Sequence, residues 1–376
     1  MSSDDETSSG ESAPMRFWRI PRPKRRYLKK QLPLLKEESR ICIENFLDYR
    51  AARTRAEFPR SRSAAVLIAL FVGREGDLYV LLSRRAAELR TYAGDTALPG
   101  GKVEPEDRSI EDTARREAYE EIGLPQDRVK VPLLCVMEPF LARNQVIVTP
   151  VVVLILDKTL QPQLNGFEVA TLFSHPLRSF LDSTPPFPAP RSEPYHTWSD
   201  HAFGETGTTR VHRFLTGREA GGIKPVFGLT ANILVAAASL GYGRPPSFEA
   251  QPPNAPTPRQ QIARAIIMPG SALNEACRTE GISPDDAAGR LLRPPFAFNA
   301  PRVLEWARIG AQWDDLLSDD EDSPAPKAKP MIDATQLAVP APTALADPAS
   351  AADVVDAATR RGFVPPKIPT PPTPPT

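Results

Sequence analysis

The stretch LPGGKVEPEDRSIEDTARREAYEEIGL, residues 98–124, constrains the fold of this chain more than any other. A Pro-Gly-Gly turn leads into an expected helix in which Glu117, Glu120 and Glu121 fall within about one turn. Carboxylates at i, i+3 and i+4 repel each other, at a cost of roughly 0.2–0.5 kcal/mol for each pair. A helix that only had to be soluble would not gather them without matching cations. The arrangement therefore predicts a bound partner that offsets the repulsion.

The ends of this helix can be placed from capping residues. Asp107 or Ser109 can cap its start, and Gly123 can end it. Ala114 and Ala118, four residues apart, form a small-residue edge that lets the helix pack close to a sheet.

Three converging carboxylates beside a Gly-Gly loop, which can approach a ligand closely, predict a site for hard divalent cations. Magnesium takes only one or two carboxylates directly and uses phosphate oxygens of the substrate for the remainder, so the expected substrate is a di- or polyphosphate. Arg116 is placed to fix one carboxylate by a forked hydrogen bond. The alternative is a solvated Arg/Glu face, which is common in helices; the flanking LPGGK and IGL segments favour the metal site.

Apolar runs around this stretch predict strands at residues 64–71, 77–85, 131–140 and 146–156, of which the first two form a hairpin. Residues 228–241 predict a buried helix that ends at a glycine, and the Pro-rich residues 184–206 predict a surface loop. This order of strands and helices is neither a strict repeat of βαβ units nor a series of hairpins. It predicts an α/β fold with a mixed sheet covered by helices, in a domain at residues 36–243.

The rest of the chain differs in composition from this domain. Residues 1–35 predict a disordered polar and basic tail, and residues 244–258 predict a Pro-rich linker. Residues 259–317 predict a helical extension, in which Ser283 caps one helix. Residues 318–376 predict a disordered Pro/Ala-rich tail.

Charge and cysteine content narrow the function classes. The formal charge is zero, so no global attraction to nucleic acid is expected. No apolar run approaches the roughly 20 residues that a membrane-spanning helix needs. Cys42, Cys135 and Cys277 are far apart and odd in number, which predicts neither a disulfide framework nor a zinc site and fits a reducing intracellular compartment.

The sequence GGKVEPEDRSIEDTARREAYEEIGL resembles the Nudix box, in which a Gly-rich loop leads to a helix bearing Arg-Glu-x-x-x-Glu-Glu-x-Gly. The matching residues are Gly101, Arg116, Glu117, Glu120, Glu121, Gly123 and Leu124. The spacing from Gly101 to Arg116 is one residue longer than in the general box, and Asp107 stands where the loop glutamate would be. This variant resembles the coenzyme A diphosphatase branch of the family, in which PGGK precedes an acid-Pro-x-Asp loop.

The upstream residues carry a second resemblance to that branch. LLSRRAAELRTYAGDTALPGG, residues 81–101, is similar to its signature of Leu-Leu-Thr, an Arg two residues on, a second Arg, a Gly and Phe-Pro-Gly-Gly. The positions that match in register are Leu81, Leu82, Arg85, Ala86, Arg90, Gly94, Pro99, Gly100 and Gly101. Ser83 replaces Thr, and Leu98 replaces Phe. The resemblance continues to about Gly243 and covers just over half of the chain.

The resemblance implies a Nudix α/β/α sandwich that hydrolyses the pyrophosphate of coenzyme A or acyl-coenzyme A. The products would be 3′,5′-ADP and (acyl-)4′-phosphopantetheine, and Mg²⁺ or Mn²⁺ would be required. Glu117, Glu120 and Glu121 would hold the metal, and Arg116 would orient them. Glu121 or Glu117 would take the proton of the attacking water, and the choice between them stays open. Glu168 is a candidate for a supporting role, because Nudix enzymes often place an acid after the last core strand.

Coenzyme A joins a pantetheine arm to adenosine through its pyrophosphate and also carries a 3′-phosphate, so it needs cationic contacts besides the metal. Arg85 and Arg90 follow a predicted strand that leads into the loop and can supply them. The expected substrate contacts are Arg85, Arg90, Gly100, Gly101 and Lys102. The alternative for the arginines is surface salt bridging.

Two other functions stay open on the sequence. The substrate could be another nucleoside diphosphate derivative such as ADP-ribose, against which the arginine signature argues. The domain could also be a catalytically silent coenzyme A sensor or protein-binding module, although a pure binder need not keep three repelling glutamates. The branch is often peroxisomal, but PPTPPT at the end of the sequence is not a peroxisomal tripeptide, so mitochondrial and cytosolic placement stay open. The sequence does not indicate an oligomeric state.

Overall fold

The computed structural model describes Leu28, Leu32 and residues 35–51, 56–157, 159–187, 193–202 and 207–293. The tail predicted for residues 318–376 and the last part of the helical extension, residues 294–317, lie outside this described part. Of the tail predicted for residues 1–35, Leu28, Leu32 and Leu35 are described, and the first two are buried.

The central feature of the structure is an eight-stranded sheet. Its main path runs β3-β2-β1-β7-β5, while β4 pairs with β1, β6 with β7 and β8 with β2. The strands are β1 (Ser63–Val72), β2 (Leu78–Arg85), β3 (Thr96–Ala97), β4 (Gly100–Lys102), β5 (Leu133–Val136), β6 (Phe140–Leu141), β7 (Ile147–Ile155) and β8 (Val169–Pro176). β1 and β7 are parallel and the other pairs are antiparallel. The predicted mixed sheet and the predicted hairpin of β1 and β2 are confirmed.

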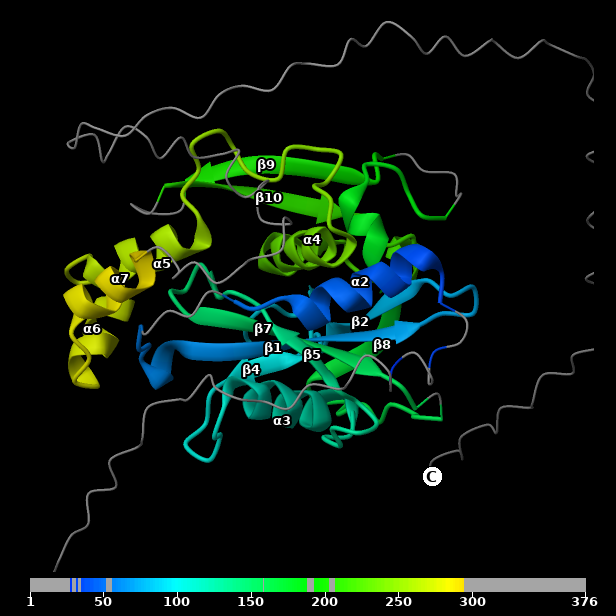
Figure 1. Ribbon diagram of the computed structural model, residues 1–376, viewed down its shortest axis with the longest axis horizontal. Helices are drawn as coiled ribbons and strands as arrows, with labels where there is room; N and C mark the ends of the chain where they lie inside the picture. The colour runs from blue at the N-terminus through cyan, green and yellow to red at the C-terminus, as the bar shows by residue number, and fades with distance from the viewer. Residues whose placement is uncertain are drawn as a thin grey trace, which may run out of the picture. The chain divides into compact units, whose positions relative to one another are not determined.

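Helices cover both faces of this sheet (Figure 1). α3 (Ile110–Ile122) lies on one face, and α2 (Glu37–Asp48) and α4 (Gly228–Tyr242) lie on the other. Separate hydrophobic clusters fill the two interfaces, one between α3 and the sheet and one between the sheet and α2 and α4. The predicted α/β/α sandwich is confirmed.

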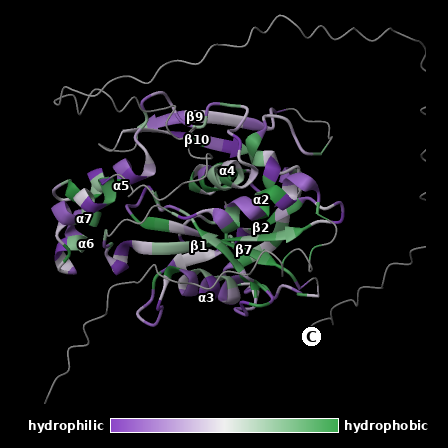
Figure 2. Ribbon diagram, in the orientation of Figure 1, coloured by the Kyte–Doolittle hydropathy of each residue, from purple (hydrophilic) through white to green (hydrophobic). Residues whose placement is uncertain are grey.

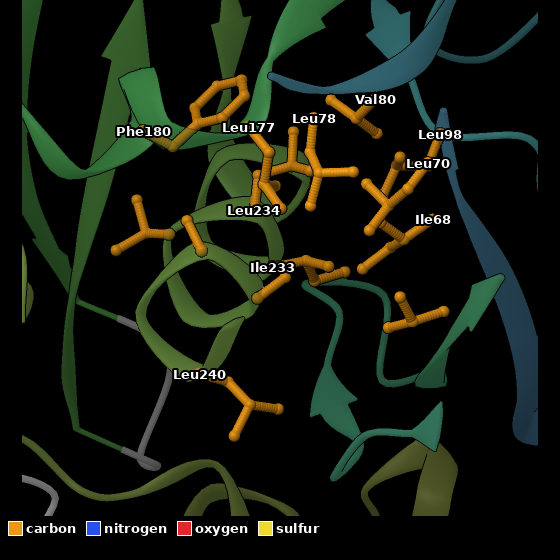
Figure 3. Packing of buried hydrophobic residues seen from close by; sticks show 14 of the residues in the cluster. Ile68, Leu70, Leu78, Val80, Leu98, Leu177, Phe180, Ile233, Leu234 and Leu240 are labelled. Carbon is orange, nitrogen blue, oxygen red and sulfur yellow. The ribbon is translucent and has the colours of Figure 1, made fainter. Parts of the chain in front are cut away.

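The interface with α4 contains the larger of these clusters. Figure 3 shows Ile233 and Leu234 of α4 packed among apolar side chains of the sheet that include Ile68 and Leu78. α4 is the predicted buried helix, and it ends at Gly243, which has a left-handed φ of 64°. α3 is different, because Figure 2 shows hydrophilic colours over much of it, whereas β7 is hydrophobic. α3 therefore buries one face and leaves polar side chains on the other.

A second, three-stranded sheet contradicts the surface loop predicted for residues 184–206. β9 (His196–Ala202), β10 (Thr208–Phe214) and β11 (Val226–Phe227) pair in the order β11-β10-β9. In Figure 1, β9 and β10 lie beyond α4, on the side away from the central sheet. The prediction was wrong because the prolines of this segment end at Pro194, and β9 is held by pairing with β10 and not by a continuous apolar run.

Three helices follow α4, namely α5 (Pro258–Ile267), α6 (Ala272–Thr279) and α7 (Pro284–Leu292). As predicted, Ser283 caps α7 by accepting a hydrogen bond from the N–H of Asp286. Apolar residues of the three helices form a cluster with Leu141 of β6 and Ile147 of β7. The helical extension is present, while the predicted domain boundaries at residues 243 and 258 stay predictions.

The segment between α4 and α5 makes specific contacts with the second sheet. Oε1 of Gln251 accepts a hydrogen bond from the N–H of Arg210 at 3.1 Å, and the carbonyl of Ala250 accepts one from Nε2 of His212 at 2.8 Å. The short 3-10 helices are η1 (Arg60–Arg62), η2 (Leu177–Leu181) and η4 (Glu219–Gly221).

Two sequence predictions on the chain's environment can be compared with the structure. Among the described residues, no helix is both long and apolar enough to cross a membrane. Cys42, Cys135 and Cys277 are buried free thiols, in agreement with the absence of a disulfide framework.

Candidate active site

The Pro-Gly-Gly segment continues into a strand, β4, and not into the predicted loop. β4 pairs antiparallel with the start of β1. A Cβ atom at Gly100 would overlap the carbonyl oxygen of Ala65, and one at Gly101 would overlap the carboxylate of Glu117. Glycine is therefore needed at the first position for strand pairing and at the second for the close approach of a glutamate from α3.

α3 starts and stops at capping residues that the sequence predicts. Ser109 caps the start by accepting a hydrogen bond from the N–H of Asp112 at 3.2 Å, whereas Asp107, the other candidate, has a different role. Gly123 follows the last residue with a left-handed φ of 67°. These caps fix the register of the glutamates on the helix.

The three glutamates run from the core to the rim of the site. Glu121 is buried with 5% of its surface exposed, Glu117 is half-buried, and the Glu120 side chain is 48% exposed. Oε2 of Glu121 accepts a hydrogen bond from the N–H of Gly100 at 3.3 Å, so the innermost carboxylate faces β4.

Arg116 joins the outer glutamates to the segment before the helix. Its Nη1 donates to Oε1 of Glu117 at 3.2 Å and to Oε2 of Glu120 at 3.0 Å. Its Nη2 donates to the carbonyl of Lys102 at 2.9 Å. The forked hydrogen bond predicted for Arg116 goes to Asp107, whose two carboxylate oxygens accept from Nε and Nη2, each at 3.1 Å.

Asp107 fixes the loop that precedes α3. It is buried and also accepts hydrogen bonds from the N–H of Glu104 and the hydroxyl of Thr113, both at 2.9 Å. Burial acts to raise the pKa of Asp107, but the hydrogen bonds from Arg116, Glu104 and Thr113 hold it below its usual value. All of these bonds favour the charged form, so Asp107 acts as a structural anion.

The pKa values of Glu117 and Glu121 shift in the opposite direction to that of Asp107. Burial raises the pKa of Glu121 to about 8, and burial also raises the pKa of Glu117. The N–H of Gly100 and the guanidinium of Arg85 act against the rise at Glu121, while the charges of Glu117 and Glu168 add to it. Burial therefore disfavours the charged forms of both carboxylates, and the neighbouring cations do not fully compensate for it.

A divalent cation would supply this missing compensation. In the part of the chain that the structure describes, no group of three or more His, Cys, Asp or Glu side chains is arranged to hold a metal ion. Arg116 donates to both Glu117 and Glu120. Glu117 and Glu121, one helical turn apart, offer hard oxygen donors inside the site, while Glu120 lies at its exposed rim. Two carboxylates with phosphate oxygens from a substrate match the ligand preference of Mg²⁺. Glu117 and Glu121 are therefore the residues that would hold it.

Three cationic side chains were predicted to bind the substrate, namely Arg85, Arg90 and Lys102. Of these, Arg85 lies next to Glu121. Nη1 of Arg85 lies 3.9 Å from Oε1 of Glu121, and its buried Nε has no hydrogen-bond partner in the described structure. Arg90 is exposed in the loop after β2, and Lys102 is exposed at the end of β4. Neither of them forms a hydrogen bond or ion pair with a glutamate of α3 in the described residues.

Glu168 lies in a segment that links α3 to β2. The carbonyl of Glu168 accepts a hydrogen bond from the N–H of Ala86 at 2.8 Å, and the carbonyl of Glu121 accepts one from the N–H of Asn165 at 3.0 Å. The charge of Glu168 contributes to the raised pKa of Glu121, so the two carboxylates are within electrostatic reach of each other.

The sequence reasoning missed a buried ion pair on another face of α3. Nε of Arg115 donates to Oε1 of Glu111 at 2.6 Å, and its Nη2 donates to the carbonyl of Val131 at 2.8 Å. Nε of Arg128 donates to the same Glu111 oxygen at 3.1 Å. The i, i+4 spacing of Glu111 and Arg115 was the available signal. This buried pair fixes the rotation of α3 and hence the direction of its glutamates.

The family model and the similar proteins identify the same family for this chain. A model of the NUDIX domain matches residues 61–198. Nudix hydrolase 22, chloroplastic, of Arabidopsis thaliana is 37% identical over 58% of this chain and 69% of that protein. Nudix hydrolase 15, mitochondrial, of the same plant is 38% identical over 53% of this chain and 66% of that protein. Peroxisomal coenzyme A diphosphatase 1 of Saccharomyces cerevisiae is 34% identical over 38% of this chain and 51% of that protein.

These relatives agree on the family and differ in their compartments. The chain spans about two thirds of the two plant proteins and about half of the yeast protein. The names of the three relatives place them in chloroplast, mitochondrion and peroxisome, so the comparison assigns no compartment to this chain. The matched residues include β4, α3 and the glutamates described above. The chain belongs to the Nudix hydrolase family, and this membership supports a pyrophosphohydrolase that acts on nucleoside diphosphate derivatives.

Proposed function

We propose that this chain hydrolyses the pyrophosphate bond of coenzyme A or its acyl thioesters, releasing 3′,5′-ADP and 4′-phosphopantetheine or its acyl derivative. The observation that carries this proposal is the 3.9 Å approach of Arg85 to Glu121. Arg85 belongs to the arginine signature of the coenzyme A branch, and Glu121 belongs to the Nudix helix. The similarity to the yeast coenzyme A diphosphatase supports the same substrate.

The roles of the side chains follow from their positions. Glu117 and Glu121 would hold Mg²⁺ or Mn²⁺, with Glu120 at the exposed rim. The cation would neutralise phosphate charge and make an attacking water more acidic. Arg116 holds Glu117 and Glu120 in place, and Asp107 holds Arg116.

The substrate would lie between these carboxylates and the end of β2. Arg85, whose Nε lacks an acceptor among the described residues, donates to pyrophosphate oxygens. Arg90, Gly100, Gly101 and Lys102 complete the proposed contacts. The proton of the attacking water passes to Glu121 or Glu117, and Glu168 supports the site through its charge.

The test is to incubate the full chain with coenzyme A and Mg²⁺ or Mn²⁺ and to identify the products by mass. We expect 3′,5′-ADP and 4′-phosphopantetheine, and we expect Glu117→Gln and Glu121→Gln to lose the activity. Glu275→Gln, on the exposed surface of α6, is the matched control and should keep it.

Other outcomes would replace the proposal. Cleavage of ADP-ribose without cleavage of coenzyme A would assign a different nucleoside diphosphate substrate. Binding of coenzyme A without turnover of any pyrophosphate would assign a silent sensor or protein-binding module.

A further inference from the structure

Two arginines outside the coenzyme A signature lie on the face of the central sheet that is opposite to α3. Along β2, Leu82 is buried in the cluster shared with α2 and α4, whereas Leu81 packs with the cluster of α3. Side chains alternate along a strand, so Arg84 lies on the same face as Leu82. The pairing of β2 with β8 shifts register between Arg84 and Arg85, and the 3.9 Å approach to Glu121 places Arg85 on the side of α3. Gly222 confirms this direction, because a Cβ atom built there would lie 3.3 Å from Nη1 of Arg84.

Arg218 lies on the same face as Arg84. Its guanidinium carbon is 5.4 Å from the centre of the Phe173 ring, and Phe173 pairs with Leu82 across β2 and β8. Directly opposite residues of paired strands share a face of the sheet. The guanidinium of Arg218 is also held by a hydrogen bond from Nη1 to the carbonyl of Thr216 at 3.3 Å.

The turn from Arg218 to Gly222 makes both contacts, that of Arg218 with Phe173 and that of Gly222 with Arg84. The N–H of Gly222 donates to the carbonyl of Glu219 at 2.9 Å, and the N–H of Ile223 donates to the carbonyl of Arg218 at 3.3 Å. Arg218 starts this turn, and Gly222 ends it against Arg84. Gly222 has a left-handed φ of 76°, and its missing Cβ leaves space for the Arg84 guanidinium. The turn therefore has Arg218 at its start and the Arg84 guanidinium against its end, on the same face of the sheet.

The charges of the two arginines are not neutralised by neighbouring acids. Within the described residues, neither Arg84 nor Arg218 forms an ion pair, and the buried Nε of Arg84 has no hydrogen-bond partner. Two acids beside these arginines are engaged elsewhere, namely Glu219, which follows Arg218, and Asp95, which precedes Thr96, the strand partner of Arg84. Oε1 of Glu219 accepts from the N–H of Thr216 at 2.5 Å, and Asp95 pairs with Lys224 at 2.6 Å.

We propose that Arg84 and Arg218 form a subsite for a phosphomonoester that the substrate carries apart from the bond to be cleaved. Two guanidiniums with spare donors match the geometry and charge of a phosphate dianion. Arg84 precedes Arg85, so a ligand over the end of β2 reaches the glutamate site on one side and the arginine pair on the other. The inference rests on the proposed function, because coenzyme A carries a 3′-phosphate on the same ribose as its pyrophosphate.

The kinetic test compares coenzyme A with 3′-dephospho-coenzyme A in the full chain. In Arg84→Gln and in Arg218→Gln, we expect KM for coenzyme A to rise at least about tenfold, or about 1.4 kcal/mol. KM for 3′-dephospho-coenzyme A should stay within about twofold of wild type. Arg74→Gln is the matched control, because Arg74 is an exposed arginine in the turn at the other end of β2. Equal losses on both substrates, or no loss on either, would overturn the subsite.

A binding test separates this subsite from the proposed hydrolysis. Titration calorimetry in metal-free buffer compares 3′,5′-ADP with 5′-AMP, and we expect at least about tenfold tighter binding of 3′,5′-ADP by wild type. Arg84→Gln and Arg84→Lys should reduce that preference, and thermal melts verify that both variants are folded. Equal binding of the two nucleotides by wild type would overturn the subsite. A preserved preference in a chain that does not cleave coenzyme A would support the subsite and reject the proposed reaction.

Discussion

Arg116 and Asp107 form a two-point ion pair in which Nε and Nη2 donate to the two carboxylate oxygens, each at 3.1 Å. The remaining donor of the same guanidinium, Nη1, contacts Glu117 and Glu120. The loop before α3 and the glutamates of α3 are thus held by one side chain. Because Asp107 is buried, this link is protected from solvent.

Replacing Arg116 with lysine should damage both stability and activity. A lysine has one compact ammonium and cannot bond both oxygens of Asp107 while also reaching Glu117. The buried carboxylate of Asp107 would lose part of its hydrogen bonding, at a cost of about 1–3 kcal/mol in the free energy of unfolding. Displacement of the glutamates should lower kcat/KM about 10–100-fold. Urea unfolding and steady-state kinetics measure the two effects.

Arg178→Gln is the matched control for that variant. Arg178 forms an exposed ion pair with Glu38 at 2.7 Å, and exposed pairs contribute about 0–1 kcal/mol. Its stability should change little and its activity should not change. Losses in Arg116→Lys no larger than those in this control would contradict the linking role of Arg116.

Divalent cations should stabilise the wild type and not a variant without Glu121. Mg²⁺ or Mn²⁺ at about 100 times its Kd adds about 2.7 kcal/mol to a protein that binds it only when folded. We expect that cation to raise the Tm of wild type by several degrees relative to EDTA. Glu121→Gln should lose that rise. In EDTA it should be at least as stable as wild type at neutral pH, since it removes a carboxylate that burial disfavours.

Differential scanning fluorimetry with and without EDTA makes this measurement. Glu275→Gln removes an exposed carboxylate from α6 and should keep the full cation-dependent rise in Tm. If Glu117→Gln and Glu121→Gln both keep the rise, the cation is held elsewhere and the ligand assignment fails.

The features that the sequence predicts well are local. Ser109, Gly123 and the glutamate spacing all act within a few residues of α3, so capping and helical periodicity are enough to place them. The hairpin of β1 and β2 is also local, because a short turn joins two adjacent apolar strands.

The features that the sequence does not predict depend on distant partners. β4 forms because Ala64 and Ala65 of β1, more than thirty residues earlier, present free backbone groups to it. Asp107 was a candidate cap for α3. Its carboxylate instead accepts hydrogen bonds from Arg116, nine residues later in α3. The direction of Arg84 matters only because the turn that ends at Gly222 folds back over it. No periodicity within β2 contains that information.

Replacing each glycine of β4 with alanine should separate stability from activity. Gly100→Ala would place a methyl group against the backbone of Ala65, which cannot move away without breaking the pairing of β4 with β1. It should lower the free energy of unfolding by about 1–3 kcal/mol. Gly101→Ala would meet only the carboxylate end of Glu117, which can rotate away.

Gly101→Ala should therefore unfold near the wild-type urea concentration but lose about tenfold or more in kcat/KM, because Glu117 is displaced. Gly166→Ala has no atom within 4 Å of the added methyl group and is the control for both measurements. Equal destabilisation by Gly100→Ala and Gly101→Ala would mean that Glu117 cannot yield, and the proposed separation would be wrong.

Stability should fall with decreasing pH through a pair of stacked histidines on the second sheet. Nε2 of His212 donates to the carbonyl of Ala250, so its Nδ1 accepts the hydrogen bond at 3.0 Å from Nε2 of His196. Burial, with a smaller effect of His212, lowers the pKa of His196 from 6.5 to about 4, and burial also lowers the pKa of His212. Both rings are therefore neutral in the folded protein, whereas the unfolded chain takes up protons below pH 6.5.

This difference in proton binding sets the expected pH profile. The contribution of His196 to stability is complete above pH 6.5 and is lost as the pH falls toward about 4, by less than about 1.4 kcal/mol per pH unit because this ring is only half-buried. The contribution of His212 changes in the same direction. His196→Phe should flatten the profile, since it keeps an aromatic ring packed against Phe248 and removes one titrating ring. His201→Gln removes an exposed histidine from the same strand and should leave the profile unchanged. Urea unfolding at pH 7.5, 6.5, 5.5 and 4.5 measures these slopes, and parallel profiles for wild type and His196→Phe would exclude the pair as the origin of the pH dependence.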